Sequence, residues 1–277
     1  TEHTTLTANY KGSQVSSDVA AYANNSQRKI VRTPETPTNW LHQVYQSMGH
    51  VFIEHSTNNG TSWFIGNNGQ PLDGAAGGKN PSIDWWYDSM YNKGYLIIAF
   101  QQQYGSHYQI RCEFFRNDNG MYYNTNSGRT LHYELTDSYS VNANPNITWG
   151  EATGKFALTF ERKSVDTYGR QPGIYWIYGD LNQTGMYPHA PTSPQYIPNT
   201  DANSINAAVS LKKSAVDSDG NFDVVYEQYS SGASTIKDAY LRCYWEGNSW
   251  YPLYNGTDAL SISSGYKNYK PSMVKLS

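Results

Sequence analysis

The chain repeats one short apolar segment five times along its length. The copies are Lys29-Ile30-Val31, Pro81-Ser82-Ile83, Pro145-Asn146-Ile147, Ala207-Ala208-Val209 and Pro271-Ser272-Met273. Counted between the aligned residues Ile30, Ile83, Ile147, Val209 and Met273, the steps are 53, 64, 62 and 64 residues. A nearly constant period of this size indicates that structural units of one kind are stacked along the chain.

Each of the first four copies is followed by three more segments that resemble strands. The second series comprises 42–46, 97–101, 157–161 and 223–227, and the third, with period-2 alternation, comprises 50–55, 108–115, 173–178 and 239–245. A fourth piece contains Trp63, Tyr122, Tyr187 or Trp250. Four short strands per unit and no helical periodicity predict an all-β fold, a β-propeller of four-stranded antiparallel blades.

The repeat also predicts how the chain is organised. We expect a single propeller domain over residues 1–277, with four whole blades at 27–78, 79–142, 143–203 and 204–267. Residues 1–26 are expected to form an outer strand and linker, and 268–277 the inner strand of a partial fifth blade. Since that last unit lacks its middle strands, we expect a segment of a longer propeller, with unusual ring closure as the alternative.

Charge and hydropathy exclude two classes of partner. The formal net charge is −3 and charged residues make up only 16% of the chain, so the basic stripe of nucleic-acid-binding proteins is missing. The longest apolar run, 95–100, is far shorter than the roughly 20 residues that cross a bilayer. We therefore expect neither a nucleic-acid partner nor a membrane span.

One turn carries a family resemblance. Ser56-Thr57-Asn58-Asn59-Gly60-Thr61-Ser62-Trp63 resembles the Asp-box turn of sialidase-like propellers, with Asn58 in place of the usual Asp and Ser62 in place of Thr. Asn80-Pro81-Ser82-Ile83 is likewise similar to propeller repeats of secreted bacterial surface proteins. The resemblance implies a propeller fold and a secreted or cell-surface location.

Sialidases clamp a carboxylate with three arginines and use a Tyr/Glu nucleophile pair with an acid/base carboxyl group. In this chain Arg32 stands near the place of the first arginine, Tyr226-Glu227 resembles the nucleophile pair, and Glu161 offers a second carboxyl group. These four residues are the catalytic candidates if the chain is an enzyme.

The two glutamates also have a structural interpretation. Glu161 and Glu227 recur at the repeat position that Gln46 and Gln101 occupy in the other units. A position that accepts either an amide or an acid in every unit is expected to hydrogen-bond the neighbouring blade.

The loops between second and third strands have a composition that suits glycans. Each places a tyrosine among amides or hydroxyls, and the candidate ligand-binding residues are Tyr104, His107, Tyr168, Arg170 and Tyr229. An aromatic ring can stack on the apolar face of a sugar while neighbouring polar groups meet its hydroxyls. By propeller geometry, we expect these loops to share one face.

Metal and cofactor signals are weak in this sequence. The stretch 217–221 alternates oxygen-bearing side chains that could hold calcium, but Gly220 falls at the fourth place and Asp-Gly is ordinary hairpin chemistry. The seven histidines show no paired metal-ligand spacing. We expect no cofactor, with calcium as the alternative.

Taken together, these patterns favour a secreted or cell-surface recognition module that is not an enzyme. It would bind a carbohydrate or another surface protein through loops on one face of the propeller. The first alternative is a sialidase-like glycoside hydrolase, and the second is a structural spacer of a surface layer or filament. A fold of this kind hosts all three.

Overall fold

A computed structural model provides the structure of the chain. It describes residues 16, 18, 21, 27–34, 39–88, 92–118, 121–124, 141–149, 155–165, 168–181, 188–189, 194–211, 220–230, 233–246 and 249–262. Within these ranges the only helical element is the single 3-10 turn η1 (Asn67–Gly69). The all-β prediction is confirmed for this part of the chain.

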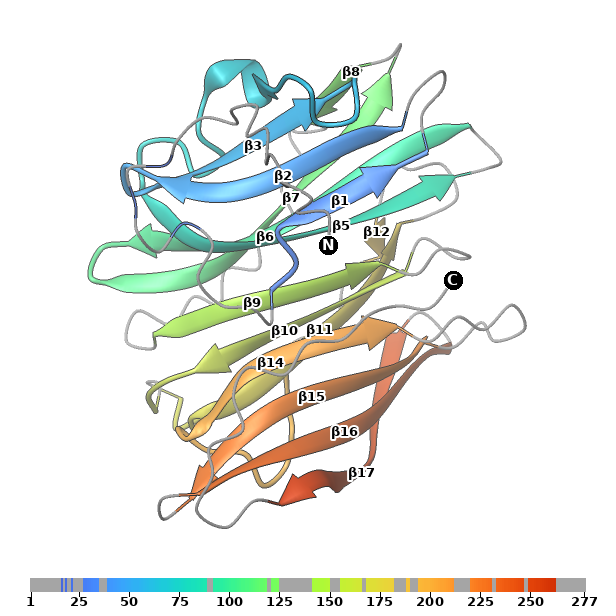
Figure 1. The fold of residues 1–277 in the computed structure, drawn as a ribbon. Coiled ribbons are helices and arrows are strands. Elements are labelled where there is room, and N and C mark those ends of the chain that lie inside the picture. Colours follow the sequence, from blue (N-terminus) through green and yellow to red (C-terminus); the bar gives the residue numbers. More distant parts are fainter. Residues whose placement is uncertain are drawn as a thin grey trace, which may run out of the picture.

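The strands of the described ranges form four antiparallel sheets that follow one another in chain order (Figure 1). The first sheet contains β1 (Ile30–Thr33), β2 (Trp40–Ser47), β3 (His50–Ser56) and β4 (Phe64–Ile65). The second contains β5 (Gly78–Asp88), β6 (Lys93–Tyr104), β7 (His107–Asp118) and β8 (Met121–Asn124). The third contains β9 (Asn142–Trp149), β10 (Lys155–Arg162), β11 (Gly173–Leu181), β12 (Pro188–His189) and β13 (Gln195–Tyr196), and the fourth contains β14 (Ser204–Leu211), β15 (Gly220–Ser230), β16 (Ala233–Glu246) and β17 (Ser249–Ile262).

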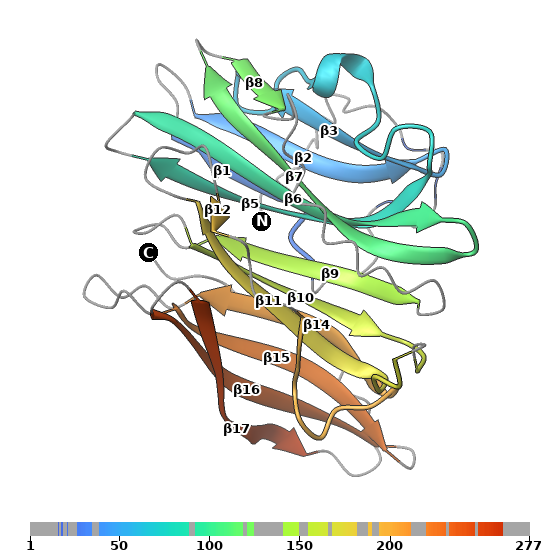
Figure 2. The same ribbon diagram turned by 180° about the vertical axis from the view of Figure 1, so that it is seen from behind.

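Strand order within each sheet follows the sequence, so neighbouring strands are joined by hairpins (Figure 2). The third sheet has one addition, because β13 pairs with β11 beside β12. The predicted first, second and third series fall on the first three strands of each sheet, which confirms those assignments. The fifth copy at 271–273 lies outside the described residues.

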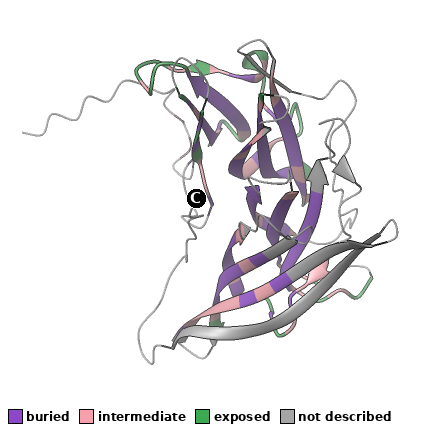
Figure 3. Cartoon of the chain, turned by 90° about the vertical axis from the view of Figure 1, so that its right-hand side faces the viewer, coloured by how far each residue is buried: buried purple, intermediate pink, exposed green. Residues whose placement is uncertain are grey.

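The sheets pack face to face, and the two middle sheets bury both of their faces. In β6, Leu96, Ile98 and Phe100 pack toward the first sheet, whereas Ile97 and Ala99 pack toward the third. Successive side chains of a strand point to opposite faces, so a strand between two sheets is apolar on both. Figure 3 shows the buried residues concentrated along the strand interiors and the exposed ones at the turns.

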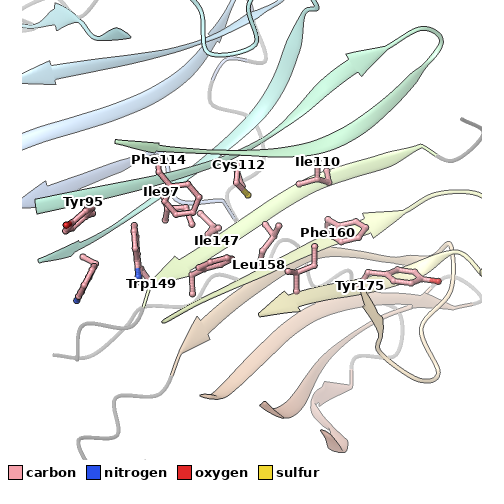
Figure 4. Packing of buried hydrophobic residues seen from close by; sticks show 14 residues of the cluster. Tyr95, Ile97, Ile110, Cys112, Phe114, Ile147, Trp149, Leu158, Phe160 and Tyr175 are labelled. Atoms are coloured by element: carbon pink, nitrogen blue, oxygen red, sulfur yellow. The ribbon is translucent and has the colours of Figure 1, made fainter. Parts of the chain in front are cut away.

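Each contact between successive sheets is called a seam here: the first seam lies between the first and second sheets, and so on. An apolar cluster fills each of the three seams. In the second seam, Phe114 and Trp149 meet edge to face with ring centroids 5.7 Å apart (Figure 4). Such aromatic contacts add to the free energy gained by burying the rings.

Hydrogen bonds also join the first strands of successive sheets. Ile147 N donates to Ser82 Oγ at 3.3 Å across the second seam, and Val209 N donates to Asn146 Oδ1 at 3.4 Å across the third. Ser82 and Asn146 occupy one repeat position, so the first strands run side by side in register. Four-stranded sheets arranged through their first strands form a propeller-like fold. How many blades complete the ring stays a prediction.

The turn that resembles an Asp box is built around Asn58. Its Oδ1 accepts hydrogen bonds from Ser62 N at 2.8 Å and from Ser56 Oγ at 3.0 Å, and Ser56 Oγ in turn accepts one from Gly60 N at 2.8 Å. Asn59 and Gly60 have φ of 58° and 84°, a conformation that Asn and Gly tolerate best. The side-chain oxygen of Asn58 thus supplies the hydrogen-bond acceptor that this β3–β4 turn requires.

Candidate functional site

Three asparagines mark the same position in the first strand of the second, third and fourth sheets. Asn80, Asn144 and Asn206 have φ of 51°, 49° and 55°, in the left-handed region. The register of each first strand shifts at this point, as expected of a β-bulge. A bulge re-aims the backbone N–H of each asparagine away from its own ladder, which leaves it available to the preceding sheet.

The acid or amide at the end of each second strand accepts that N–H. Asn144 N donates to Gln101 Oε1 at 3.1 Å, and Asn206 N donates to Glu161 Oε1 at 2.7 Å. The first seam has the same bond at 3.3 Å, from Asn80 N to Gln46 Oε1. The prediction that this position bonds the neighbouring unit is therefore confirmed for Gln46, Gln101 and Glu161. For Glu227 it stays a prediction, because the bonds described for Glu227 lie within its own sheet.

Asn206 brings the two candidate glutamates together. Its backbone N–H bonds Glu161, and its side-chain Nδ2 donates to Glu227 Oε2 at 3.0 Å. Because the two nitrogens of one asparagine are at most about 5 Å apart, the two bonded carboxyl oxygens lie within roughly 11 Å of each other. Carboxyl pairs of glycoside hydrolases stand about 5–9.5 Å apart, so this upper limit is compatible with such a pair.

Each carboxylate has further partners besides Asn206. Lys163, at the start of the β10–β11 loop, forms an ion pair with Glu161 Oε2, and Asn144 Nδ2 donates to Glu161 Oε1 at 3.1 Å. Ser234 Oγ donates to Glu227 Oε1 at 2.8 Å. Both glutamates are buried, whereas the Lys163 side chain is 33% exposed. Glu161 thus has a cationic neighbour that reaches solvent.

The other two catalytic candidates lie away from this pair. Arg32 is exposed, and its Nη2 donates to Asn59 Oδ1 at 3.0 Å in the β3–β4 turn. That turn lies at the end of the first sheet opposite to the carboxyl end of β2, where Gln46 stands in the position of Glu161. Tyr226 is buried in the apolar cluster of the third seam. The structure therefore brings together Glu161 and Glu227 but not Arg32 or Tyr226.

Four of the five predicted ligand-binding residues stand at the carboxyl ends of second strands or in the turns that follow them, and His107 is the first residue of β7, directly after such a turn. We call this end of the sheets the rim; Glu161 and Glu227 lie at the same end. Tyr104, Tyr168 and Tyr229 are 67%, 75% and 39% exposed. The Arg170 guanidinium carbon lies 5.2 Å from the centre of the Tyr168 ring, and His107 Nε2 is 3.0 Å from Ser106 Oγ.

Polar residues of the first seam escaped the sequence analysis. Gln27 Nε2 donates to the carbonyl oxygen of Asn80 at 2.8 Å, and Lys29 Nζ donates to Gln27 Oε1 at 2.9 Å. Burial lowers the pKa of Lys29 to about 7. The repeat alignment held a signal for Gln27, because it falls in the column of Asn80, Asn144 and Asn206.

Two histidines are buried in the first sheet. His42 Nδ1 lies 2.7 Å from His55 Nδ1, and His42 Nε2 lies 2.7 Å from Thr33 Oγ1. Burial lowers the pKa of His55 to about 3 and also lowers that of His42, so both rings are neutral at pH 7. Across the described ranges, no three His, Cys, Asp or Glu side chains gather as a metal site would require. The proposed calcium stretch, 217–221, falls largely outside these ranges.

None of the helical structure in the described ranges is long and apolar enough to cross a membrane. No protein-family model matches the chain, and no curated protein does. Solved structures do match. An α-L-arabinofuranosidase from Podospora anserina in complex with cellotriose is 11% identical with a TM-score of 0.42, over 83% of this chain and 68% of that one.

Two further solved structures are similar at the same level. The catalytic domain of a Coprinopsis cinerea GH62 α-L-arabinofuranosidase is 11% identical with a TM-score of 0.41, over 82% of this chain and 67% of that one. A xylan β-1,4-xylosidase from Bacillus halodurans is 14% identical with a TM-score of 0.40, over 82% of this chain and 41% of that one.

These matches correct the first functional expectation. The chain was expected to be a recognition module without catalytic activity, but all three matched structures are glycoside hydrolases, so that expectation has no support among them and is withdrawn. The hydrolase alternative is taken up below as a proposal. The resemblance to sialidase-like propellers holds for the fold alone, because the four successive antiparallel sheets are propeller-like. None of the three matched structures is a sialidase.

Proposed function

We propose that the chain is a glycoside hydrolase whose carboxyl pair is Glu161 and Glu227. The observation that carries the proposal is Asn206, which hydrogen-bonds both carboxylates and joins the third and fourth sheets at the rim. Hydrolysis of a glycosidic bond requires one carboxyl group to protonate the leaving oxygen and another to act on the anomeric carbon, directly or through water.

The contacts of the two glutamates support different roles. Glu161 accepts two N–H groups and pairs with Lys163, and all three contacts stabilise a carboxylate anion. It is therefore the nucleophile or general base. Glu227, which accepts hydrogen bonds from Asn206 Nδ2 and Ser234 Oγ, is the second carboxyl group of the pair, and we assign it as the general acid. Displacement of Lys163 would open Glu161 to a substrate.

The exposed tyrosines at the rim support a glycan as the substrate. Tyr168 lies in the β10–β11 loop that Lys163 begins, and Tyr229 stands two residues after Glu227 on β15. Rings exposed at this level provide stacking surfaces for the apolar faces of sugars. Arg170 packs on the ring of Tyr168 and adds hydrogen-bond donors beside it.

The test is hydrolysis of a panel of aryl glycosides and oligosaccharides by the wild type and by Glu161→Gln and Glu227→Gln. Glutamine is the matched replacement, because Gln101 makes the same inter-sheet bond at the equivalent position. We expect each variant to fold normally and to lose about 100-fold or more in kcat. Tyr226→Phe, in the core of the third seam, serves as the control with unchanged kcat.

Two results would contradict the proposal. One is a wild-type chain that hydrolyses no member of the panel. The other is a Glu161→Gln variant with full activity and an unchanged melting temperature. That result would limit Glu161 to its structural hydrogen bond between the third and fourth sheets.

A further inference from the structure

Two lysines, Lys79 and Lys163, stand at the rim on the second and third sheets. Lys79 comes directly before the asparagine of its bulge, and Lys163 comes two residues after the acid at the end of its second strand. The same positions of the other repeats hold uncharged residues: Ser26, Ala143 and Ile205 for Lys79, and Met48, Gln103 and Tyr229 for Lys163. Since the repeated architecture does not need a cation at either position, both ammonium groups are additions to it.

The ammonium group of Lys79 rests on an aromatic ring. Its Nζ lies 3.9 Å from the centre of the Tyr108 ring, a cation–π contact, and both side chains are half-buried. In the part of the chain that the structure describes, no carboxylate pairs with Lys79. The positive charge of Lys79 is therefore available to an anion that arrives from solvent.

Lys163 is held by an ion pair that it can leave. Its side chain is 33% exposed, whereas its partner Glu161 is buried. Glu161 Oε1 also accepts N–H groups from Asn144 and Asn206, so the carboxylate keeps two hydrogen bonds when the ammonium group moves away. An ammonium group on a flexible stem that reaches solvent can exchange one anionic partner for another, because each single contact is weak.

One residue, Val141, connects the surroundings of the two lysines. Tyr108 pairs with Val141 across the second seam, and the backbone N–H of Lys163 donates to the carbonyl oxygen of Val141 at 2.9 Å. Tyr108 and Lys163 are thus two strand spacings apart, about 10 Å between their Cα atoms. An oligosaccharide of a few sugars can span this distance along the rim.

The loop that Lys163 begins adds a guanidinium group. The guanidinium carbon of Arg170 lies 5.2 Å from the ring centre of Tyr168, which is 75% exposed. The whole chain has a formal net charge of −3, so cations at this part of the rim do not follow from its composition. Positive groups beside exposed aromatic rings suit a saccharide that combines apolar ring faces with anionic substituents.

We propose that the substrate of the carboxyl pair is an acidic oligosaccharide, whose carboxylate or sulfate groups bind Lys79 and Lys163. The inference rests on the proposed function, because it names the substrate class of that site. On binding, the ammonium group of Lys163 moves from Glu161 to an anionic group of the substrate, and no covalent bond changes in this exchange. The acidic substrate thereby uncovers Glu161, whereas a neutral saccharide leaves the ion pair in place.

The experiment is affinity electrophoresis of the intact chain in native gels that contain a polyuronate, a sulfated galactan or a neutral galactan. We expect the acidic polysaccharides to retard the wild type and the neutral galactan to leave its migration unchanged. The stronger of the two acidic gels shows whether a carboxylate or a sulfate is the group that binds. Between 0.1 and 1 M salt the screening length falls from about 10 Å to about 3 Å, so the retardation should largely disappear.

Methionine is the matched replacement for each lysine, because it keeps an apolar stem and removes the charge. We expect Lys79→Met and Lys163→Met each to raise the dissociation constant for the acidic polysaccharide about fivefold, and Lys163→Arg to keep it within about twofold of the wild type. Lys155→Met is the control, since Lys155 begins β10 at the end opposite to the rim and its loss changes the net charge equally. Its dissociation constant should stay within about twofold of the wild type.

The outcomes separate this inference from the proposed function. Equal retardation by acidic and neutral gels, or equal effects of Lys155→Met and the two rim variants, would overturn the inference, whatever the chain hydrolyses. A wild type that binds acidic polysaccharides through both lysines but hydrolyses no glycoside would overturn the proposed function and leave the acidic binding surface supported. Where hydrolysis is present, we expect Lys163→Met to lower kcat/KM about fivefold for acidic substrates and to raise it for neutral ones.

Discussion

The second and third seams use one hydrogen-bond pattern with different chemistry. Across the second seam an amide, Gln101, accepts the N–H of Asn144, and across the third a carboxylate, Glu161, accepts the N–H of Asn206. The amide meets the structural requirement alone. The negative charge of Glu161 and its ion pair with Lys163 are therefore additions to the architecture, and additions of this kind are where function is to be sought.

The largest effect is expected from Glu161→Leu. The variant leaves Asn206 N–H and the Asn144 amide without an acceptor and Lys163 without its counterion, and each unpaired buried donor costs about 1–3 kcal/mol. We expect the free energy of unfolding, measured with urea, to fall by about 3 kcal/mol or more. Glu161→Gln should cost less than about 1 kcal/mol, because it makes the third seam resemble the second. If Glu161→Leu and Glu161→Gln lowered the free energy of unfolding equally, the view that an amide can replace the carboxylate in this seam would be wrong.

A smaller loss is expected when Asn206 is changed. Asn206→Ala removes the bond to Glu227 and places alanine at φ 55°, where residues other than glycine are strained by about 1–2 kcal/mol. Asn206→Gly removes the same hydrogen bond, but glycine adopts this positive φ without strain. We expect alanine to lower the free energy of unfolding by about 2 kcal/mol and glycine by less. The same pair of variants at Asn144 provides the second-seam control.

The first seam adds a titratable group to the comparison. Burial lowers the pKa of Lys29 to about 7, while in the unfolded chain the pKa keeps its ordinary value of 10.5. Between these values the unfolded state binds more protons, so the stability contributed by Lys29 rises with pH by about 1.4 kcal/mol per unit and is constant below pH 7. Urea titrations at pH 7, 8 and 9 should show this slope in the difference between the wild type and Lys29→Met. An identical pH dependence of the two proteins would contradict the assignment.

The smallest effect is expected at Cys112, which is buried in the second seam and should react only slowly with an alkylating reagent. Burial raises the pKa of the Cys112 thiol to about 12, with a further contribution from Glu113. We expect iodoacetamide at pH 8 to alkylate Cys112 about 100-fold more slowly in the native protein than in urea. Rapid alkylation of the native protein would show that this seam opens easily.

The repeat made much of the architecture predictable, because strands that bury both faces leave a strong and regular apolar pattern. It also predicted the inter-sheet role of the column that contains Gln101 and Glu161, since a position that varies only between amide and acid must accept a hydrogen bond in every unit. This repeat position could be recognised from the sequence without knowing which group donates the hydrogen bond.

The partner itself could not be predicted. Asn206 acts through a positive φ at a bulge, and bulges leave no clear trace in the alternation of a strand. Arg32 was a candidate because it stands near the place of the first sialidase arginine, beside a first strand, but sequence position does not say at which end of a sheet a side chain emerges. The two rim lysines belong to different sheets, and only the folded strands bring Tyr108 and Lys163 to either side of Val141.

The strands that face two neighbours have an evolutionary consequence. A substitution on β6 or β10 changes the fit of one sheet to the sheet before it or to the sheet after it, while the adjacent residue governs the opposite contact. Units descended from one ancestral copy therefore cannot drift independently. Each must diverge in step with the two beside it, so exchanging a single unit for a duplicate of another would mismatch two boundaries at once.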